Sequence, residues 1–362
     1  MELEALISEI TPLDEAAMEL ARQRQAQLAK PPGSLGRLEA LSIQLAGITG
    51  KVINTIEKKH LLVFAADNGV VEEGVSSAPQ SVTLMQTINL TRHKTGASTL
   101  CRHFGAQITV CDVGVNADIT EQKVINHKIA YGTQNMTKGS AMTRAQAEQA
   151  VGIGFELARN TDAHVLGIGE MGIGNTTTSA AVLSVLLGAE VETVTGRGGG
   201  LTEESFRKKK EVIQKAIQVN SPNKNDVLDV LSKVGGFDLA AMCGAFLGAA
   251  ASHRPVVIDG FISAVAALCA CRICPEAVYY FVPSHASYEI GYKLAMEEMG
   301  LQPMLLLDMR LGEGSGCPLA FEVLSAACAI MGDMATFDQA GIDDGYLDEI
   351  RVGDQFTVEE HP

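Results

Sequence analysis

Short apolar segments recur along the chain, and each is followed by glycine with an acidic or hydroxyl residue and then by a helix-like stretch. Nearly continuous hydrophobic runs that alternate with helices are typical of a parallel sheet covered on both faces. The pattern predicts an α/β fold, a three-layer sandwich with a mainly parallel, Rossmann-like sheet. The six expected strands, with their loops, lie in residues 60–70, 106–115, 163–177, 254–268, 276–287 and 303–316.

The two ends of the chain follow a different pattern. Residues 2–28 and the segment after Pro318 have apolar positions at helical spacing and contain no strand-like run. We therefore expect an N-terminal helical part in residues 1–50, an α/β catalytic domain in 51–317 and a C-terminal helical part in 318–362. The two helical parts are expected to pack together as a small domain beside the sheet.

Polar residues stand at the ends of the expected strands. Because crossover connections make the strands parallel, these residues should gather along one edge of the sheet, where open α/β sheets bind ligands. Glu313 is distinctive because three glycines accompany this single carboxylate, and glycine lets another molecule approach the main chain closely. We expect the active site at this edge, which collects Asp67, Asn68, Asp112, Glu170, Asp259, Ser284, His285 and Glu313.

Composition narrows the choice of partners. The chain has 362 residues, of which 46% are hydrophobic, and a formal net charge of −15. It therefore lacks the cationic surface that sequence-independent binding to nucleic acid or an anionic membrane requires. The first residues lack the features of a signal peptide, and no apolar stretch reaches the roughly 20 residues needed to span a bilayer. These features predict a cytoplasmic protein without membrane insertion.

Eight cysteines are scattered along the chain and are expected to be free thiols. Cys269, Cys271 and Cys274 have a spacing that a zinc or iron–sulfur site could use, but no fourth ligand lies nearby in the sequence. Ordinary buried core positions explain the three cysteines better. We expect no metal site.

Two glycine-rich loops are candidates for binding a phosphate. The first has the spacing G-x-G-x-x-G at Gly167, Gly169 and Gly172, which keeps an NAD-linked oxidoreductase as an alternative. A second turn separates these glycines from the next helix, which is expected to begin with Asn175 as its cap, followed by three threonines. Exposed amides and hydroxyls at a helix N-terminus suit a phosphate monoester better than a pyrophosphate held beside Glu170.

The second loop, residues 196–200, precedes a helix that carries Lys208, Lys209 and Lys210. It lacks the G-K-[ST] sequence of a Walker A loop. A run of lysines is most often a solvated helix face, but the neighbouring glycines favour one lysine as a phosphate ligand. A non-catalytic nucleotide-binding protein could use the same two loops, although it would leave Glu313 without a role.

Seven stretches carry a resemblance to a known family. They read KPPGSLGRLE (30–39), AADNGVVEEGVSSAPQSVT (65–83), GIGEMGIGNTTTSAA (167–181), TGRGGGL (195–201), GGFDLAAMCGAFLGAA (235–250), PVVIDGFISAVAAL (255–268) and LLLDMRLGEGSGCPLAF (305–321). In these stretches, which run in family order, the chain resembles the nicotinate-nucleotide:dimethylbenzimidazole phosphoribosyltransferase family. The resemblance implies a pentosyltransferase that converts nicotinate mononucleotide and 5,6-dimethylbenzimidazole, or a related base, into α-ribazole 5′-phosphate and nicotinate in cobalamin biosynthesis. It also implies a homodimer, for which the small residues of 239–251 would allow close packing, although a helix contact inside the chain explains them equally well.

The resemblance also implies roles for individual residues. The family's general base falls on Glu313, and its second carboxylate falls on Glu170. Its substrate-binding residues fall on Gly174, Asn175, Thr176, Gly198, Gly199 and Lys209 around the phosphate, and on Ser76, Gln80, Gln86 and Leu311 around the aromatic base. The chain departs from the common family pattern at three positions, with Asn68 and Tyr292 where histidine is frequent and Gly199 where threonine is frequent.

The chemistry of these substrates implies a simple mechanism. One benzimidazole nitrogen attacks C1′ from the face opposite the leaving group, which inverts β to α, while the carboxylate takes the proton from the other nitrogen. Nicotinate leaves as a neutral ring nitrogen, so its departure requires no general acid. The scheme therefore needs small-molecule substrates only, without a metal or an organic cofactor.

Overall fold

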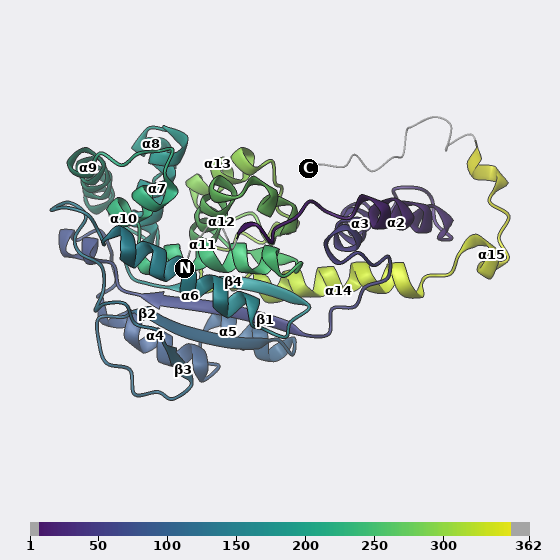
Figure 1. Ribbon diagram of the computed structural model, residues 1–362, viewed down its shortest axis with the longest axis horizontal. Helices are drawn as coiled ribbons and strands as arrows, with labels where there is room; N and C mark the ends of the chain where they lie inside the picture. Colours follow the sequence, from purple (N-terminus) through teal and green to yellow (C-terminus); the bar gives the residue numbers. More distant parts are fainter. Residues whose placement is uncertain (1–6, 349–362) are drawn as a thin grey trace.

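A six-stranded parallel sheet forms the centre of the computed structural model, which describes residues 7–348 (Figure 1). The strand order is β3-β2-β1-β4-β5-β6, so the order reverses between β1 and β4. Ligands bind at such a switch point in open α/β sheets. The prediction of a mainly parallel α/β sheet is confirmed. The strands are β1 (Lys59–Ala66), β2 (Gln107–Gly114), β3 (Val124–Asn126), β4 (Val165–Met171), β5 (Val256–Ile258) and β6 (Phe281–Pro283).

Helices fill the connections between the strands and both ends of the described chain. They are α2 (Glu15–Gln27), α3 (Arg37–Thr49), η1 (Gly69–Glu73), α4 (Ser81–Thr91), α5 (Gly96–His103), α6 (Arg144–Arg159), α7 (Asn175–Leu187), α8 (Val191–Val194), α9 (Glu203–Asn220), α10 (Val227–Val234), α11 (Phe237–Ala251), α12 (Phe261–Ile273), η2 (Pro275–Tyr280), α13 (Ile290–Met299), α14 (Cys317–Asp333), α15 (Phe337–Ala340) and η3 (Gly345–Leu347). None of the described helices is long and apolar enough to cross a membrane.

Two hydrophobic cores lie between the sheet and the helices that cover its two faces. One core joins the sheet to α6, α7, α11 and α12, and the other joins it to α3, α4, α5 and α14. Helices α6 and α11 approach closely because glycines stand where they touch. A Cβ atom on Gly154 would lie 1.7 Å from the Ala241 oxygen, and one on Gly244 would lie 1.8 Å from the Val151 oxygen. The small residues of 239–251 are therefore explained by this internal contact, and they give no support to a dimer interface.

The two ends of the chain lie together. Figure 1 shows α2 and α3 above α14 at one end of the molecule. The Arg24 Nε–H donates to the Met331 oxygen (3.3 Å), and Leu28 forms an antiparallel bridge with Thr336. Because α3 and α14 also pack on the sheet, the division at residues 50 and 318 stays a prediction. Its outermost parts, residues 1–6 and 349–362, lie outside the described range.

The expected strand at the start of residues 303–316 does not form, so this prediction is wrong. Leu305 forms one isolated bridge with His285, and the side chain of Leu306 is 84% exposed. The partner of Leu305, His285, lies beyond the end of β6 at Pro283, so the pairing does not extend the sheet. The strand that the sequence analysis missed is β3. Only Val124 of its three residues is buried, so its hydrophobic pattern is weak.

Candidate active site

A cavity of about 260 Å³ opens at the carboxyl ends of β1, β4, β5 and β6. The structure brings together here most of the residues that the sequence nominated. Gln80 and Lys209 do not line the cavity. Its predicted lining residues are Ser76, Gln86, Glu170, Gly174, Asn175, Thr176, Gly198, Gly199, Leu311 and Glu313.

Glu313 is buried and points at a helix N-terminus. Its Oε2 accepts a hydrogen bond from the Ala97 N–H (3.1 Å), which belongs to the first turn of α5. The positive end of a helix stabilises the negative charge of a carboxylate. Glu313 has a φ of 63°, between Gly312 and Gly314, which both have a φ of 84°. This left-handed run of backbone turns the side chain into the cavity wall.

The glycines around Glu313 are required by close packing. A Cβ atom on Gly312 would lie 2.5 Å from Glu170 Oε1, and one on Gly316 would lie 2.3 Å from His285 Nδ1. On the facing strand, a Cβ on Gly169 would lie 2.4 Å from the Glu313 oxygen. The loop therefore rests directly on the end of the sheet, and larger residues would lift it away.

Glu170, at the end of β4, is buried beside Glu313. Its Oε1 accepts from the Glu313 N–H (3.2 Å), and its Oε2 accepts from Asn175 Nδ2 (2.5 Å). Burial raises the pKa of Glu170 to about 8, and the nearby Asp238 carboxylate adds to the rise. At pH 7 the group therefore mostly holds its proton and can donate a hydrogen bond.

The prediction that Asn175 caps α7 is wrong. Gly174, with a φ of 92°, occupies the cap position, and Asn175 is the first helical residue. The Asn175 amide instead donates to Glu170 and to Asp238 Oδ2 (3.1 Å). The side chain is turned inward because two buried carboxyl groups need a donor. The Asn175 and Thr177 N–H groups donate to the oxygens of Gly172 (3.2 Å) and Gly174 (2.9 Å), so these two amides of the first turn are already paired.

Lys209 lies behind the two glycine loops and is only 1% exposed. Its ammonium donates to Thr176 Oγ1 (2.9 Å) and to the Gly196 oxygen (3.1 Å). Burial lowers the pKa of Lys209 to about 8, although the Glu289 carboxylate opposes this shift. Lys208 is exposed, and Lys210 lies over the Phe206 ring. Only the middle lysine of the run is directed at the loops.

The residues nominated for the aromatic base lie in the loop after β1, in α4 and at the cavity rim. Ser76 Oγ donates to the Ala78 oxygen (3.1 Å), and Gln86 Oε1 accepts from Asn89 (2.9 Å). Gln80 immediately precedes α4 outside the cavity, where its Oε1 accepts from Asn116 (3.4 Å). Leu311 is exposed at the rim.

Several lining residues had no role assigned from the sequence. Asp259 and His285 come from the ends of β5 and β6, and Glu289 comes from the loop before α13. The Glu289 carboxylate occupies the space beside Gly196, where a Cβ would lie 1.7 Å from Oε2. The strand-ending positions of Asp259 and His285 were a visible sequence signal, whereas nothing in the sequence pointed to Glu289.

The spacing G-x-G-x-x-G does not form a dinucleotide-binding turn. Gly167 and Gly169 lie inside β4. A Cβ on Gly167 would lie 2.5 Å from Cys317 Cβ, so this glycine makes room for α14. The motif therefore serves packing on the sheet, which removes the sequence argument for an NAD-linked oxidoreductase.

The three departures from the family pattern lie in different places. Gly199 lines the cavity. Asn68 is buried next to Asp238, and its Oδ1 accepts from Thr178 (3.4 Å). Tyr292 is buried in α13 outside the cavity lining.

The described residues include no group of three or more His, Cys, Asp or Glu side chains arranged to hold a metal ion. All eight cysteines are free, and Cys269 and Cys274 are buried in the core while Cys271 is partly buried. Their arrangement agrees with a packing role.

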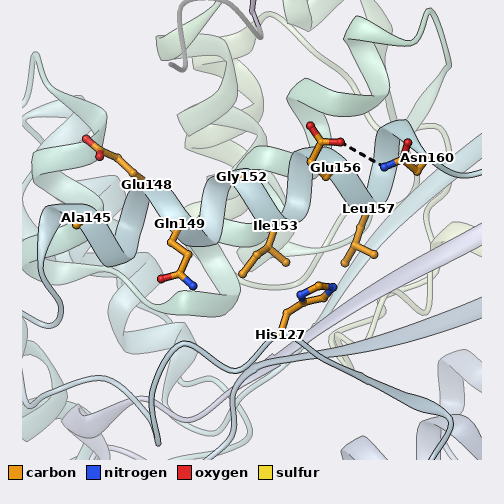
Figure 2. A pocket seen from close by; sticks show the side chains of 9 residues that line it. All are labelled: His127, Ala145, Glu148, Gln149, Gly152, Ile153, Glu156, Leu157 and Asn160. Atoms are coloured by element: carbon orange, nitrogen blue, oxygen red, sulfur yellow. Dashed lines mark hydrogen bonds between the residues drawn. The ribbon is translucent and has the colours of Figure 1, made fainter. Parts of the chain in front are cut away.

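A second hollow, of about 660 Å³, runs along α6 and shares no residue with the cavity. Figure 2 shows Ile153 and Leu157 facing His127, with Glu156 hydrogen-bonded to Asn160 (3.3 Å). None of the predicted site residues lies there. Its lining mixes polar and apolar side chains and lacks the combination of glycine loops, cation and carboxylates found at the sheet edge.

Comparisons with known proteins agree on one family. A family profile described as phosphoribosyltransferase matches residues 10–342. The nicotinate-nucleotide–dimethylbenzimidazole phosphoribosyltransferase of Clostridium perfringens is 50% identical over 359 residues, which are 98% of this chain and 99% of that protein. The protein of the same name from Ruminiclostridium cellulolyticum is 51% identical over 346 residues, or 95% of this chain and 98% of its own length. The crystal structure of CobT from Thermus thermophilus is 37% identical, has a TM-score of 0.87, and covers 91% of this chain and 100% of its own.

Proposed function

The chain belongs to the nicotinate-nucleotide–dimethylbenzimidazole phosphoribosyltransferase family and is a pentosyltransferase; from this premise we propose that it makes α-ribazole 5′-phosphate and nicotinate from nicotinate mononucleotide and dimethylbenzimidazole or a related base. One observation carries the proposal. The Glu313 carboxylate and both glycine loops line the same cavity. A phosphate and a reacting base can therefore be held in a single site.

The phosphate of nicotinate mononucleotide binds between the two glycine loops. The start of α7, a helix of 13 residues, places its positive end at the phosphate. Thr176 adds a hydroxyl, and Lys209 adds a buried positive charge that already contacts that hydroxyl. This arrangement supplies the local positive field that a chain with a net charge of −15 otherwise lacks.

Glu313 acts as the general base. The aromatic base lies between Glu313 and the residues of the 76–86 segment, and one of its ring nitrogens attacks C1′ while Glu313 removes the proton from the other. The C1′–pyridinium bond breaks and nicotinate takes the bonding electron pair, so C1′ is inverted from β to α. The Ala97 amide keeps the carboxylate in place for this proton transfer.

The test is to incubate the purified protein with nicotinate mononucleotide and a panel of bases comprising dimethylbenzimidazole, benzimidazole, adenine and a phenol. Mass spectrometry should detect the nucleotide of at least one base together with free nicotinate, and NMR should show the α configuration at C1′. Absence of product with every base would contradict the proposal. A parallel assay with NAD and hydroxy acids should show no nicotinamide absorbance change.

The affinity for nicotinate mononucleotide should depend on pH through Lys209. With its pKa lowered to about 8, Lys209 is charged below that pH and becomes neutral above it. The KM for nicotinate mononucleotide should stay nearly constant between about pH 7 and 7.5 and rise by up to about tenfold per pH unit above about pH 8. Steady-state kinetics across this range measures the effect. If Lys209→Ala shows the same rise, another group is responsible.

We also propose a homodimer, on the basis of the family resemblance alone. Light scattering at low micromolar concentration should give about twice the chain mass of 38.3 kDa. A species of the single-chain mass alone would contradict the proposal.

A further inference from the structure

Asp259 holds the Glu313 loop through two backbone hydrogen bonds. The Gly314 N–H donates to Asp259 Oδ2 (3.0 Å), and the Gly316 N–H donates to Asp259 Oδ1 (2.7 Å). Asp259 follows β5, and its own N–H donates to Ser263 Oγ (3.1 Å) at the start of α12. A rigid strand end is thus connected directly to the loop that carries the base.

Backbone amides are the main groups that stabilise the negative charge of Asp259. Burial raises the pKa of Asp259 to about 7, and hydrogen bonds from the Gly316, Gly314 and Gly260 amides oppose this rise. The carboxylate is 2% exposed, and His285 Nδ1 lies 3.8 Å away. Burial lowers the pKa of His285 to about 4, so at pH 7 the ring is neutral and gives no ion pair. Both carboxylate oxygens are therefore committed to the loop amides.

The Glu313 loop needs such an anchor because its backbone is unusual. Three consecutive residues, 312–314, have a positive φ, and one of them is not glycine. A left-handed non-glycine residue persists where its surroundings hold it. Glu170 accepts the Glu313 N–H, and Asp259 accepts the Gly314 and Gly316 amides. Two neighbouring strands thereby clamp the loop.

We infer that Asp259 is a positioning residue for the transfer reaction, which sets the direction of the Glu313 carboxylate through the Gly314 and Gly316 amides. The inference rests on the proposed role of Glu313 as the general base. Proton transfer depends on geometry at the scale of an ångström. Without the hydrogen bonds to Asp259, the loop still carries the Glu313 carboxylate but no longer holds it in the orientation needed for proton transfer.

The test is a double-mutant cycle with Glu313→Gln. Asp259→Asn keeps the size of the side chain but places an NH2 group against one of the two amide donors, so the loop must shift. We expect kcat to fall about tenfold, with the KM for nicotinate mononucleotide changed less than about twofold. In the Glu313→Gln background the same substitution should cost almost nothing further, because a misplaced base matters only while the base is present.

Asp112→Asn is the matched control. Asp112 is also a buried strand-end aspartate, and its Oδ1 accepts two backbone amides, from Gly114 (3.0 Å) and Val115 (2.8 Å). Its Oδ2 also forms an ion pair with Lys128 (2.8 Å), so its substitution tests the loss of a buried contact away from the Glu313 loop. Its substitution should lower the thermal midpoint and, where it affects kcat at all, should do so equally in both backgrounds. Loss of stability alone therefore does not reproduce the expected pattern.

The outcomes separate the inference from the proposed function. A wild-type protein that forms no product contradicts the proposed function. Product formation with an unchanged kcat in Asp259→Asn, or with additive effects of Asp259→Asn and Glu313→Gln, contradicts the positioning role alone. Should Asp259→Asn fail to fold, Ser263→Ala loosens Asp259 through its main chain, and the same non-additive loss of kcat is then expected.

Discussion

Replacing Glu313 by glutamine should lower kcat by about 10²- to 10⁴-fold, the usual cost of losing a general base. The amide keeps the size and polarity of the carboxyl group but cannot accept the proton. Its oxygen can still accept the Ala97 N–H, so the loop should remain in place. Single-turnover rates measure the effect on chemistry, and calorimetry with each substrate should show little change in affinity.

A structural role for Glu313 predicts a different result from the same variant. The thermal midpoint would then fall, while the folded fraction would keep nearly normal activity. A folded variant that binds both substrates and turns over at the wild-type rate would show that Glu313 is not the base. Glu170 would be the next residue to test, because its carboxyl group lies against the same loop.

Lys209→Ala should weaken the binding of nicotinate mononucleotide by about 1.5 to 3 kcal/mol, the typical value of a hydrogen bond to a charged group, because it removes the buried charge that holds Thr176 at the phosphate loop. This corresponds to a loss of roughly 10- to 150-fold in affinity. The affinity for the aromatic base should change far less, because Lys209 lies behind Thr176 at the phosphate loops. Isothermal titration with each substrate separates the two effects.

The neighbouring lysines provide controls on the same helix. Lys208 is exposed, and Lys210 lies over the Phe206 ring, 4.2 Å from its centroid. Lys208→Ala and Lys210→Ala should both leave the affinity for nicotinate mononucleotide within about twofold. An equal loss in all three variants would mean that the lysines act through general charge and that the phosphate is held elsewhere.

The central strands could be predicted from the sequence because burial on both faces leaves a continuous apolar run, as in residues 61–66 and 165–168. Residues 305–307 have the same composition but lie past the last strand of the sheet. Composition records that a segment is apolar, but not whether a partner strand is available. The error at β3 was the opposite one. The segment is a strand, but two of its three side chains are exposed, so it has no apolar run.

At the site, functional residues in glycine-rich loops could be predicted from the sequence, but their hydrogen-bond partners could not. Glu313 was singled out by its glycines, yet the Ala97 amide that holds it lies 216 positions away. Asn175 was expected to cap its own helix because a local pattern favours local bonds. Two buried carboxyl groups, Glu170 and Asp238, compete for that amide, and only the fold brings them together.

The position of Glu313 late in the sequence sets the order in which the parts of the site are synthesised. Both phosphate loops and Lys209 leave the ribosome roughly 100 residues before the Glu313 loop does, and domains fold as their chain emerges. A chain that ends before residue 313 contains both phosphate loops but not the base. Turnover must therefore await the arrival of α14, whose first turn directly follows the loop and seats it on the sheet. Translation therefore delivers both phosphate loops before the loop that carries the base.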